Sequence, residues 1–190
     1  MPTTTSSALR DDLAFIRRAV ERSTPWQWPP AIACLWGVVV AAGFAVIDLQ
    51  PQTAPLYWGV AAPTAFLASL WLGRRGAARR GQEDRRLAMV ITMHWTGLLA
   101  AGGLAALAAL AGAITWSVMA ATMVLLSATV YYLAGVHGDR RLLWVAGALG
   151  LGYLAVLFLP RGAWTAAGLL FAVAVVSAAF LGRPGADDRR

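Results

Sequence analysis

Long apolar runs, separated by short polar or charged segments, make up most of the chain. Their approximate ranges are 31–49, 55–73, 87–111, 114–135, 142–159 and 163–181. As an α-helix, each run can cross a hydrocarbon core of roughly 30 Å, because a helix rises about 1.5 Å per residue. The pattern therefore predicts an all-α membrane protein with six transmembrane helices.

The segments between these runs indicate how consecutive helices are paired. Three connections are very short, at 50–54, 112–113 and 160–162. Loops of this length usually join antiparallel neighbours. The predicted bundle is therefore three antiparallel hairpins, joined by charged linkers at 74–86 and 136–141.

The residues before the first run follow an amphipathic pattern. Apolar side chains recur at Leu9, Leu13, Ile16 and Val20, in steps of four, three and four residues that place them on one face of a helix. Charged side chains occupy the other faces. The segment 1–30 is therefore predicted to contain a cytoplasmic amphipathic helix, followed by a linker rich in Trp and Pro.

The composition agrees with a single membrane domain. Hydrophobic residues account for 59% of the 190 residues and charged residues for only 13%, whereas a soluble domain has about 25% charged residues. The predicted organisation is a transmembrane bundle over 31–181, preceded by the segment 1–30 and followed by a cytoplasmic tail over 182–190.

Charge is distributed very unequally between the two ends of the predicted helices. Fifteen of the sixteen arginines and eight of the nine acidic residues fall on one side, and only Arg161 and Asp48 fall on the other. The positive-inside rule assigns the arginine-rich side, with both termini, to the cytoplasm. A composition rich in Ala, Gly and Arg, without Lys, is typical of a GC-rich bacterial genome, so the predicted location is the bacterial inner membrane.

Tryptophans recur at similar spacings in the three predicted hairpins. The pairs are Trp36 and Trp58, Trp95 and Trp116, and Trp144 and Trp164. One interpretation is a hairpin that has been triplicated. The other is that Trp prefers the membrane interface, so that regular loops produce regular Trp spacing.

Ionisable side chains within the predicted spans are few, and each is a candidate for function because burying it in a bilayer is costly. His94 lies about two turns into the third run, and His137 lies at the cytoplasmic end of the fourth. A neutral imidazole can ligate haem or a metal ion, or carry a proton. The alternative is a bond from His94 to a nearby hydroxyl or carbonyl. Asp48, at the outer end of the first run, is expected to be a solvated acid.

Motifs of catalysis and metal binding are missing from the chain. It has no GxSG or HExxH motif, no paired intramembrane aspartates and a single cysteine, Cys34. No predicted helix centre holds an acidic or basic residue, which disfavours ion-coupled transport. We therefore expect no enzymatic activity, no metal site and no cofactor, with haem at His94 as the one exception to be considered.

Small residues recur every four positions in the third and fifth runs. They are Ala101, Ala105 and Ala109 in the third, and Ala148 and Gly152 in the fifth. Small residues at this spacing let two helices approach closely in lipid. These residues are predicted helix-packing positions, either within one bundle or between subunits of a homo-oligomer.

The linker 74–86 is strongly basic. Its six arginines are Arg74, Arg75, Arg79, Arg80, Arg85 and Arg86. Each basic side chain near an anionic leaflet contributes roughly 1 kcal/mol of attraction. With Arg17, Arg18 and the apolar face of the N-terminal helix, this linker predicts a docking or regulatory platform for a protein partner or anionic lipid. Nucleic acid is not an expected partner, because no aromatic platform accompanies the arginines.

The run DLAFIRRAVERS, at 12–23, resembles the N-terminal helix of small bacterial multi-span membrane proteins of unassigned function. In those proteins a DLxFIRxxxE-like helix precedes the first span. They can be encoded beside winged-helix transcriptional regulators, so the resemblance implies a regulatory role at the membrane. It implies no catalytic residue.

Two other functions remain open from the sequence. A haem- or quinone-binding electron carrier would depend on His94. A small-solute facilitator would depend on the repeated hairpins and would need no buried charge.

Overall fold

The computed structural model describes Leu13, Phe15 and the segments 29–80, 85–159 and 161–181. The described residues form α-helices and one short 3-10 helix, with no strand among them. The elements are α2 (Pro30–Leu49), η1 (Pro51–Thr53), α3 (Ala54–Arg80), α4 (Arg85–Leu110), α5 (Trp116–His137), α6 (Leu142–Phe158) and α7 (Ala163–Phe180).

Five helical segments are long and apolar enough to cross a membrane. They are Pro30–Leu49, Pro51–Gly76, Thr92–Leu110, Trp116–His137 and Ala163–Phe180. The remaining helix, α6, is also apolar but has only 17 residues, which is the short end of the usual range for a spanning helix. The all-helical prediction is confirmed, and five of the six predicted spans have the length and apolarity that membrane crossing requires.

The described parts of the linker 74–86 are helical, so both helices extend into the segment predicted to join them. Helix α3 continues to Arg80, and α4 already begins at Arg85. Alanine and arginine are both good helix formers. Long arginine side chains can also extend from a helix end toward polar surroundings. The apolar run therefore ends before the helix does.

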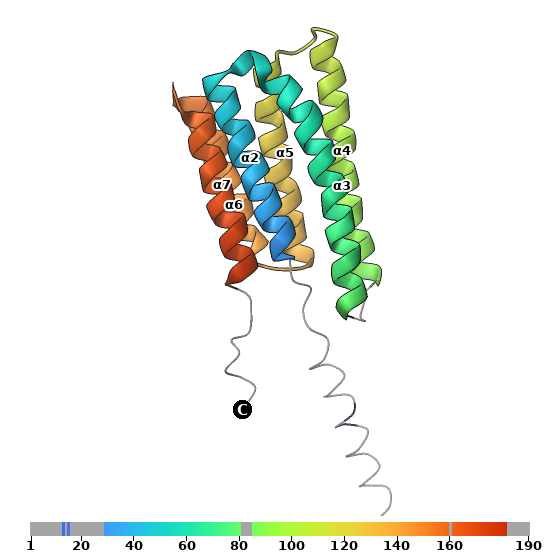
Figure 1. Ribbon diagram of the computed structural model, residues 1–190. Coiled ribbons are helices and arrows are strands. Elements are labelled where there is room, and N and C mark those ends of the chain that lie inside the picture. Colours follow the sequence, from blue (N-terminus) through green and yellow to red (C-terminus); the bar gives the residue numbers. More distant parts are fainter. Residues whose placement is uncertain (1–12, 14, 16–28, 81–84, 160, 182–190) are drawn as a thin grey trace, which may run out of the picture.

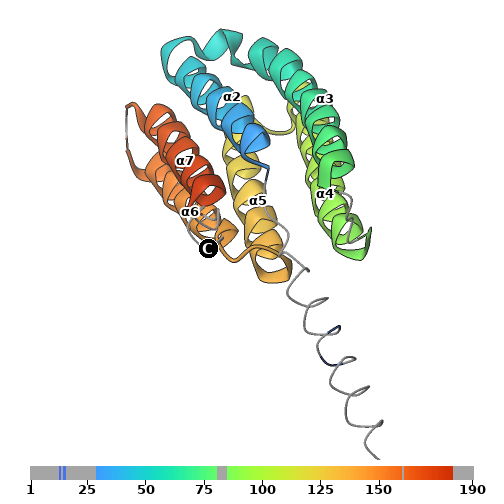
Figure 2. The same ribbon diagram turned by 60° about the horizontal axis from the view of Figure 1, so that its bottom comes forward.

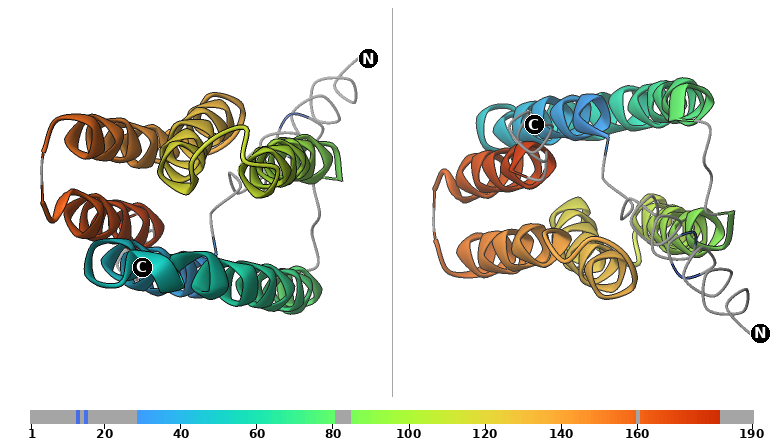
Figure 3. Two further views of the ribbon diagram at one scale, coloured as in Figure 1. Left: turned by 90° about the horizontal axis from the view of Figure 1, so that it is seen from above. Right: turned by 90° about the horizontal axis from the view of Figure 1, so that it is seen from below.

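The helices lie in two rows of three (Figure 3). One row contains α3, α2 and α7, and the other contains α4, α5 and α6, with consecutive helices pointing in opposite directions (Figure 1). Figure 2 shows α2 and α5 between the α6–α7 side and the α3–α4 side. Helix α2 packs more extensively against α7 than against α3, and α5 more extensively against α6 than against α4. The contacts therefore do not single out three hairpins.

Aromatic rings fill much of the core. Phe44 of α2 makes edge-on contacts with Trp58 and Trp164, at centroid distances of 5.9 and 5.4 Å. Tyr131 of α5 makes similar contacts with Trp95, at 5.2 Å, and with Phe171, at 5.7 Å. Of these contacts, the one between Tyr131 and Phe171 joins the two rows, and edge-on geometry suits the charge distribution of aromatic rings.

The tryptophans of the suspected repeat lie in dissimilar surroundings. Trp164 is buried in the core, whereas Trp144 is 80% exposed. Trp36 donates a hydrogen bond from Nε1 to Ser69 Oγ at 3.0 Å, which joins α2 to α3. Equivalent positions of a triplicated hairpin should share their surroundings, so these differences do not support the triplication.

One of the two small residues predicted to pack in α6, Gly152, lies against α7. Ala148 and Gly152 are both buried, and a Cβ at Gly152 would lie 2.9 Å from Ala167 Cβ. In α4, Ala109 is buried, while Ala101 and Ala105 are half-buried. Gly152 therefore packs within one chain.

Candidate functional site

Charged residues gather at one end of the bundle, the lower end in Figure 1. At this end α3 finishes and α4 and α6 begin. We call it the basic end, and its arginines among the described residues are Arg74, Arg75, Arg79, Arg80, Arg85, Arg86, Arg140 and Arg141. At the opposite end the described part of the chain has only Arg161 and Asp48 as charged residues.

Arg75 and Trp71 make a cation–π contact at the basic end. The guanidinium carbon of Arg75 lies 4.2 Å from the centre of the Trp71 ring, well within the range for this interaction. Arg74 and Arg75 are both exposed. A tryptophan beside exposed arginines is typical of the interface between hydrocarbon and lipid headgroups.

The predicted docking residues of the N-terminal helix are only partly described. Leu13 is helical and 58% exposed, and Phe15, two residues later, is helical and 67% exposed. The predicted residues Leu9, Ile16, Arg17, Arg18 and Val20 lie outside the described residues. The exposure of Leu13 is compatible with an apolar face that is free to bind.

The chain's two histidines meet at the basic end. His94 lies in α4 and His137 is the last residue of α5. Their rings are stacked, with centroids 5.3 Å apart and planes inclined by 20°. The sequence placed both residues toward the cytoplasmic side, and the structure brings them into direct contact.

The two imidazoles differ in their hydrogen bonding. His137 Nδ1 lies 2.9 Å from the Leu133 carbonyl oxygen. A carbonyl only accepts, so Nδ1 must carry the proton of this bond, and the neutral ring keeps Nε2 as an acceptor. His94 Nδ1 is buried and has no hydrogen-bond partner. The expected bond to a neighbouring hydroxyl or carbonyl is therefore absent at this atom, which makes it a candidate binding group.

The stacked arrangement does not suit haem ligated by both histidines. Axial ligation requires a nitrogen from each imidazole to point at one iron between them, whereas these two rings present their faces to each other. Among the described residues, no group of three or more His, Cys, Asp or Glu is placed to hold a metal ion. The geometry of the two rings is better suited to binding a proton than to ligating a metal ion.

The charged residues that follow His137 are mostly basic. Asp139 is only 12% exposed, and its Oδ1 accepts a hydrogen bond from the Arg141 backbone N–H at 3.0 Å. Its other oxygen lies 4.0 Å from the Arg141 guanidinium. The carboxylate nearest in sequence to the histidine pair is thus already engaged by an arginine.

Asp48 is a helix cap, which corrects its expected role as a solvated acid. Its Oδ2 accepts hydrogen bonds from both the backbone N–H and the hydroxyl of Thr165, each at 2.7 Å. Thr165 lies in the first turn of α7, where backbone N–H groups lack partners within the helix. The sequence could not indicate this pairing, because the two residues are 117 positions apart.

Comparison with known proteins adds no assignment: no family model, no curated protein and no solved structure matches this chain.

Proposed function

We propose that this chain is an integral protein of the bacterial inner membrane that serves as a docking and regulatory platform for a protein partner. The observation that supports this most directly is the collection of arginines at the basic end, with only Arg161 and Asp48 charged at the other end of the described bundle. By the positive-inside rule the basic end, with both termini, faces the cytoplasm.

The proposed binding surface combines apolar and basic groups. Leu13 exposes an apolar side chain on the N-terminal helix, and Arg74, Arg75 and Arg140 are exposed at the basic end. Apolar contact excludes water at the centre of a protein interface, a few well-packed residues, often aromatic or arginine, supply most of the binding energy, and charges steer association and select the partner. The proposed partner is therefore a cytoplasmic protein with an acidic, partly apolar surface.

Site-specific photo-crosslinking in native membranes tests this proposal. A photoreactive residue at position 13 should give a discrete protein adduct, because Leu13 is predicted to face the partner. Ile16→Asp should abolish the adduct, since it places a charge on the same predicted face. Ala14→Asp is the matched control, because position 14 falls on the opposite face of the predicted helix, and it should leave the adduct intact.

The crosslinking outcomes also distinguish a protein partner from a lipid as the molecule bound at this surface. Adducts with phospholipid alone would contradict protein docking and favour an anionic membrane surface as the occupant. An adduct that survives Ile16→Asp would show that the predicted apolar face does not bind.

A second candidate function, a response to pH, is favoured by the histidine stack. Histidine is the side chain whose ordinary charge change falls between pH 5 and 8. Protonation of both rings would place two positive charges within a contact of 5.3 Å, beside an end already rich in arginine. Helix α4 packs mainly against α5, so this repulsion would act on the main contact of α4 and move the arginine-rich segment before it.

A further inference from the structure

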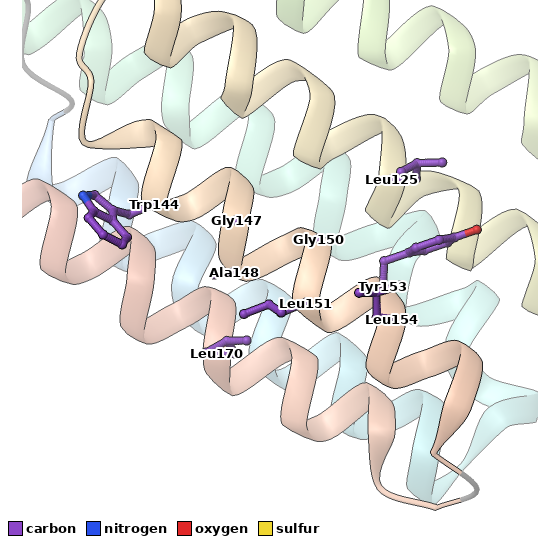
Figure 4. Close-up of a pocket in the computed structure, with 9 residues that line it drawn as sticks. All are labelled: Leu125, Trp144, Gly147, Ala148, Gly150, Leu151, Tyr153, Leu154 and Leu170. Carbon is purple, nitrogen blue, oxygen red and sulfur yellow. The ribbon is translucent and has the colours of Figure 1, made fainter.

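An open groove runs along the outer face of α6. It has a volume of about 700 Å³ and is lined by residues of α5, α6 and α7. Figure 4 shows the groove between Trp144, near the start of α6, and Leu125 with Tyr153 farther along. The Trp144 N–H and the Tyr153 hydroxyl are the polar side-chain groups of its lining, and the rest is aromatic rings, aliphatic side chains and glycine. In a bilayer such a groove faces lipid chains rather than water.

Two glycines keep the floor of this groove open. Gly147 and Gly150 both line it, and at neither position would a Cβ come within 4 Å of another atom. Gly152 of the same helix differs, because a Cβ there would lie 2.9 Å from Ala167 Cβ. Gly152 thus serves the contact between α6 and α7, whereas Gly147 and Gly150 leave space for something outside the described chain.

The length of the groove matches one leaflet of a membrane. Trp144 and Leu154 line its two ends along α6. Ten residues of helix rise about 15 Å, which is half of a hydrocarbon core of roughly 30 Å. The groove therefore has the reach of a single acyl chain that starts at the membrane surface and ends near the midplane.

Two arginines directly precede α6, close in sequence to Trp144 at one end of the groove. Arg140 lies four residues before Trp144 and is exposed, and Arg141 is the residue just before the helix begins. Arg141 is engaged by Asp139, but no carboxylate among the described residues pairs with Arg140. We propose that this groove binds one acyl chain of an anionic phospholipid, with its phosphate at the Arg140 guanidinium. Arginine binds phosphate oxygens through strong, charge-assisted hydrogen bonds.

A second copy of the chain fits the groove less well. Two copies in one membrane share the same orientation, so a symmetric dimer through α6 has its twofold axis along the membrane normal. Such a dimer would bring the Arg140 residues of both copies toward each other, and like charges repel. A phospholipid instead brings a negative group to the same place.

Native mass spectrometry of the full chain in detergent tests the proposal. The probes are dioleoyl-phosphatidylglycerol and dioleoyl-phosphatidylcholine in equal amounts, which share acyl chains but differ in net charge. The unaltered protein should retain the anionic lipid in preference. Arg140→Gln should reduce that preference about fivefold, because one basic side chain contributes roughly 1 kcal/mol to anionic lipid binding.

Groove-filling variants separate this site from general lipid binding. Gly147→Leu and Gly150→Leu should each lower retention of both lipids, because leucine occupies the acyl-chain space. Gly103→Leu is the matched control, since Gly103 is also an exposed helical glycine with no atom within 4 Å of a Cβ, but lies in α4. It should retain lipid as the unaltered protein does, and circular dichroism verifies the helix content of every variant.

Three results would overturn the proposal. Equal retention of both lipids by the unaltered protein would remove the role of Arg140. Unchanged retention in both groove variants would place the lipid elsewhere. Dimers in the unaltered protein that disappear in Gly147→Leu would identify a second copy as the occupant.

Discussion

Single residues determine how closely two helices approach each other. Gly43 of α2 is one of them: a Cβ there would lie 2.6 Å from Tyr57 Cε1 and 2.8 Å from Trp58 Cε2. The absence of a side chain lets Tyr57 approach α2 and donate its hydroxyl hydrogen bond to the Val39 carbonyl at 2.8 Å. Close approach of this kind is the main attraction between helices in lipid.

Gly43→Ala should therefore destabilise the protein by about 1–3 kcal/mol, the usual cost of overpacking. Gly59→Ala is the control, because a Cβ at Gly59 meets nothing within 4 Å. The control should match or slightly exceed the unaltered stability, because alanine favours helix. Unfolding in mixed detergent micelles measures both, and equal stability of the two variants would contradict the close contact.

Asp48→Ala should lower stability by about 1–2 kcal/mol, because it leaves the first turn of α7 without its hydrogen-bond acceptor. Asp48→Asn keeps an oxygen that can accept from Thr165 and should lose less. The same unfolding measurement compares the two. An alanine variant as stable as the asparagine variant would show that the contacts of 2.7 Å do not contribute.

The sequence predicts which end of the bundle holds the two histidines, but it does not predict that their rings are in contact. The helical pattern places His94 and His137 toward the same side of the membrane. Their stacking depends on how α4 and α5 are rotated about their axes, which neither helix encodes alone. The Asp48 cap was missed for the same reason, because its partner comes from a distant part of the chain.

At the scale of elements, apolar length predicts the helices well and their ends less well. The apolar run at 55–73 identifies α3, but α3 extends to Arg80. The residues after the apolar run are mainly alanine and arginine, which favour helix although the segment is no longer apolar. Helix α6 shows the opposite effect. It ends at Phe158, just before Pro160, and a proline disfavours helical geometry in the residue before it.

Helix α4 is the element whose position should depend on pH. Two charged imidazoles at about 5 Å repel by about 1–3 kcal/mol, depending on solvent screening. Lowering the pH from 8 to 5 should therefore separate α4 from α5 at the basic end. Spin labels at Met89→Cys and Val136→Cys, both exposed sites, report this distance in a Cys34→Ser background.

The increase in distance should vanish in His137→Gln, which leaves one titratable ring. Labels at Leu104→Cys and Val118→Cys are the control pair, because these exposed residues lie toward the opposite ends of the same helices. Their separation should change little. A distance at the basic end that is identical at pH 5 and pH 8 would contradict a pH response by this pair.

For the molecule as a whole, the sequence predicts a membrane protein and the end at which its charges lie. It does not predict which helices pack against each other. A helix that is apolar on all sides carries no periodic pattern that identifies its packing face. The extensive contact between α2 and α7 therefore could not be anticipated, nor could the groove on α6, which three helices form together. Charge follows a simpler rule, because each arginine must avoid the hydrocarbon core whatever its helix packs against.

The segregation of charge also predicts an orientation of the molecule in the membrane. In the predicted orientation, the segment that joins α3 to α4 faces the cytoplasm and the segment that joins α2 to α3 faces the opposite side. The function proposed for the basic end depends on this orientation, because a cytoplasmic partner can reach it only there.

Cysteine labelling of intact cells tests the orientation directly. In a Cys34→Ser background, Gln52→Cys and Gln82→Cys place one thiol in each of these two segments. A membrane-impermeant maleimide should label position 52 in spheroplasts and position 82 only after the inner membrane is opened. Labelling of position 82 in intact spheroplasts would contradict a cytoplasmic basic end.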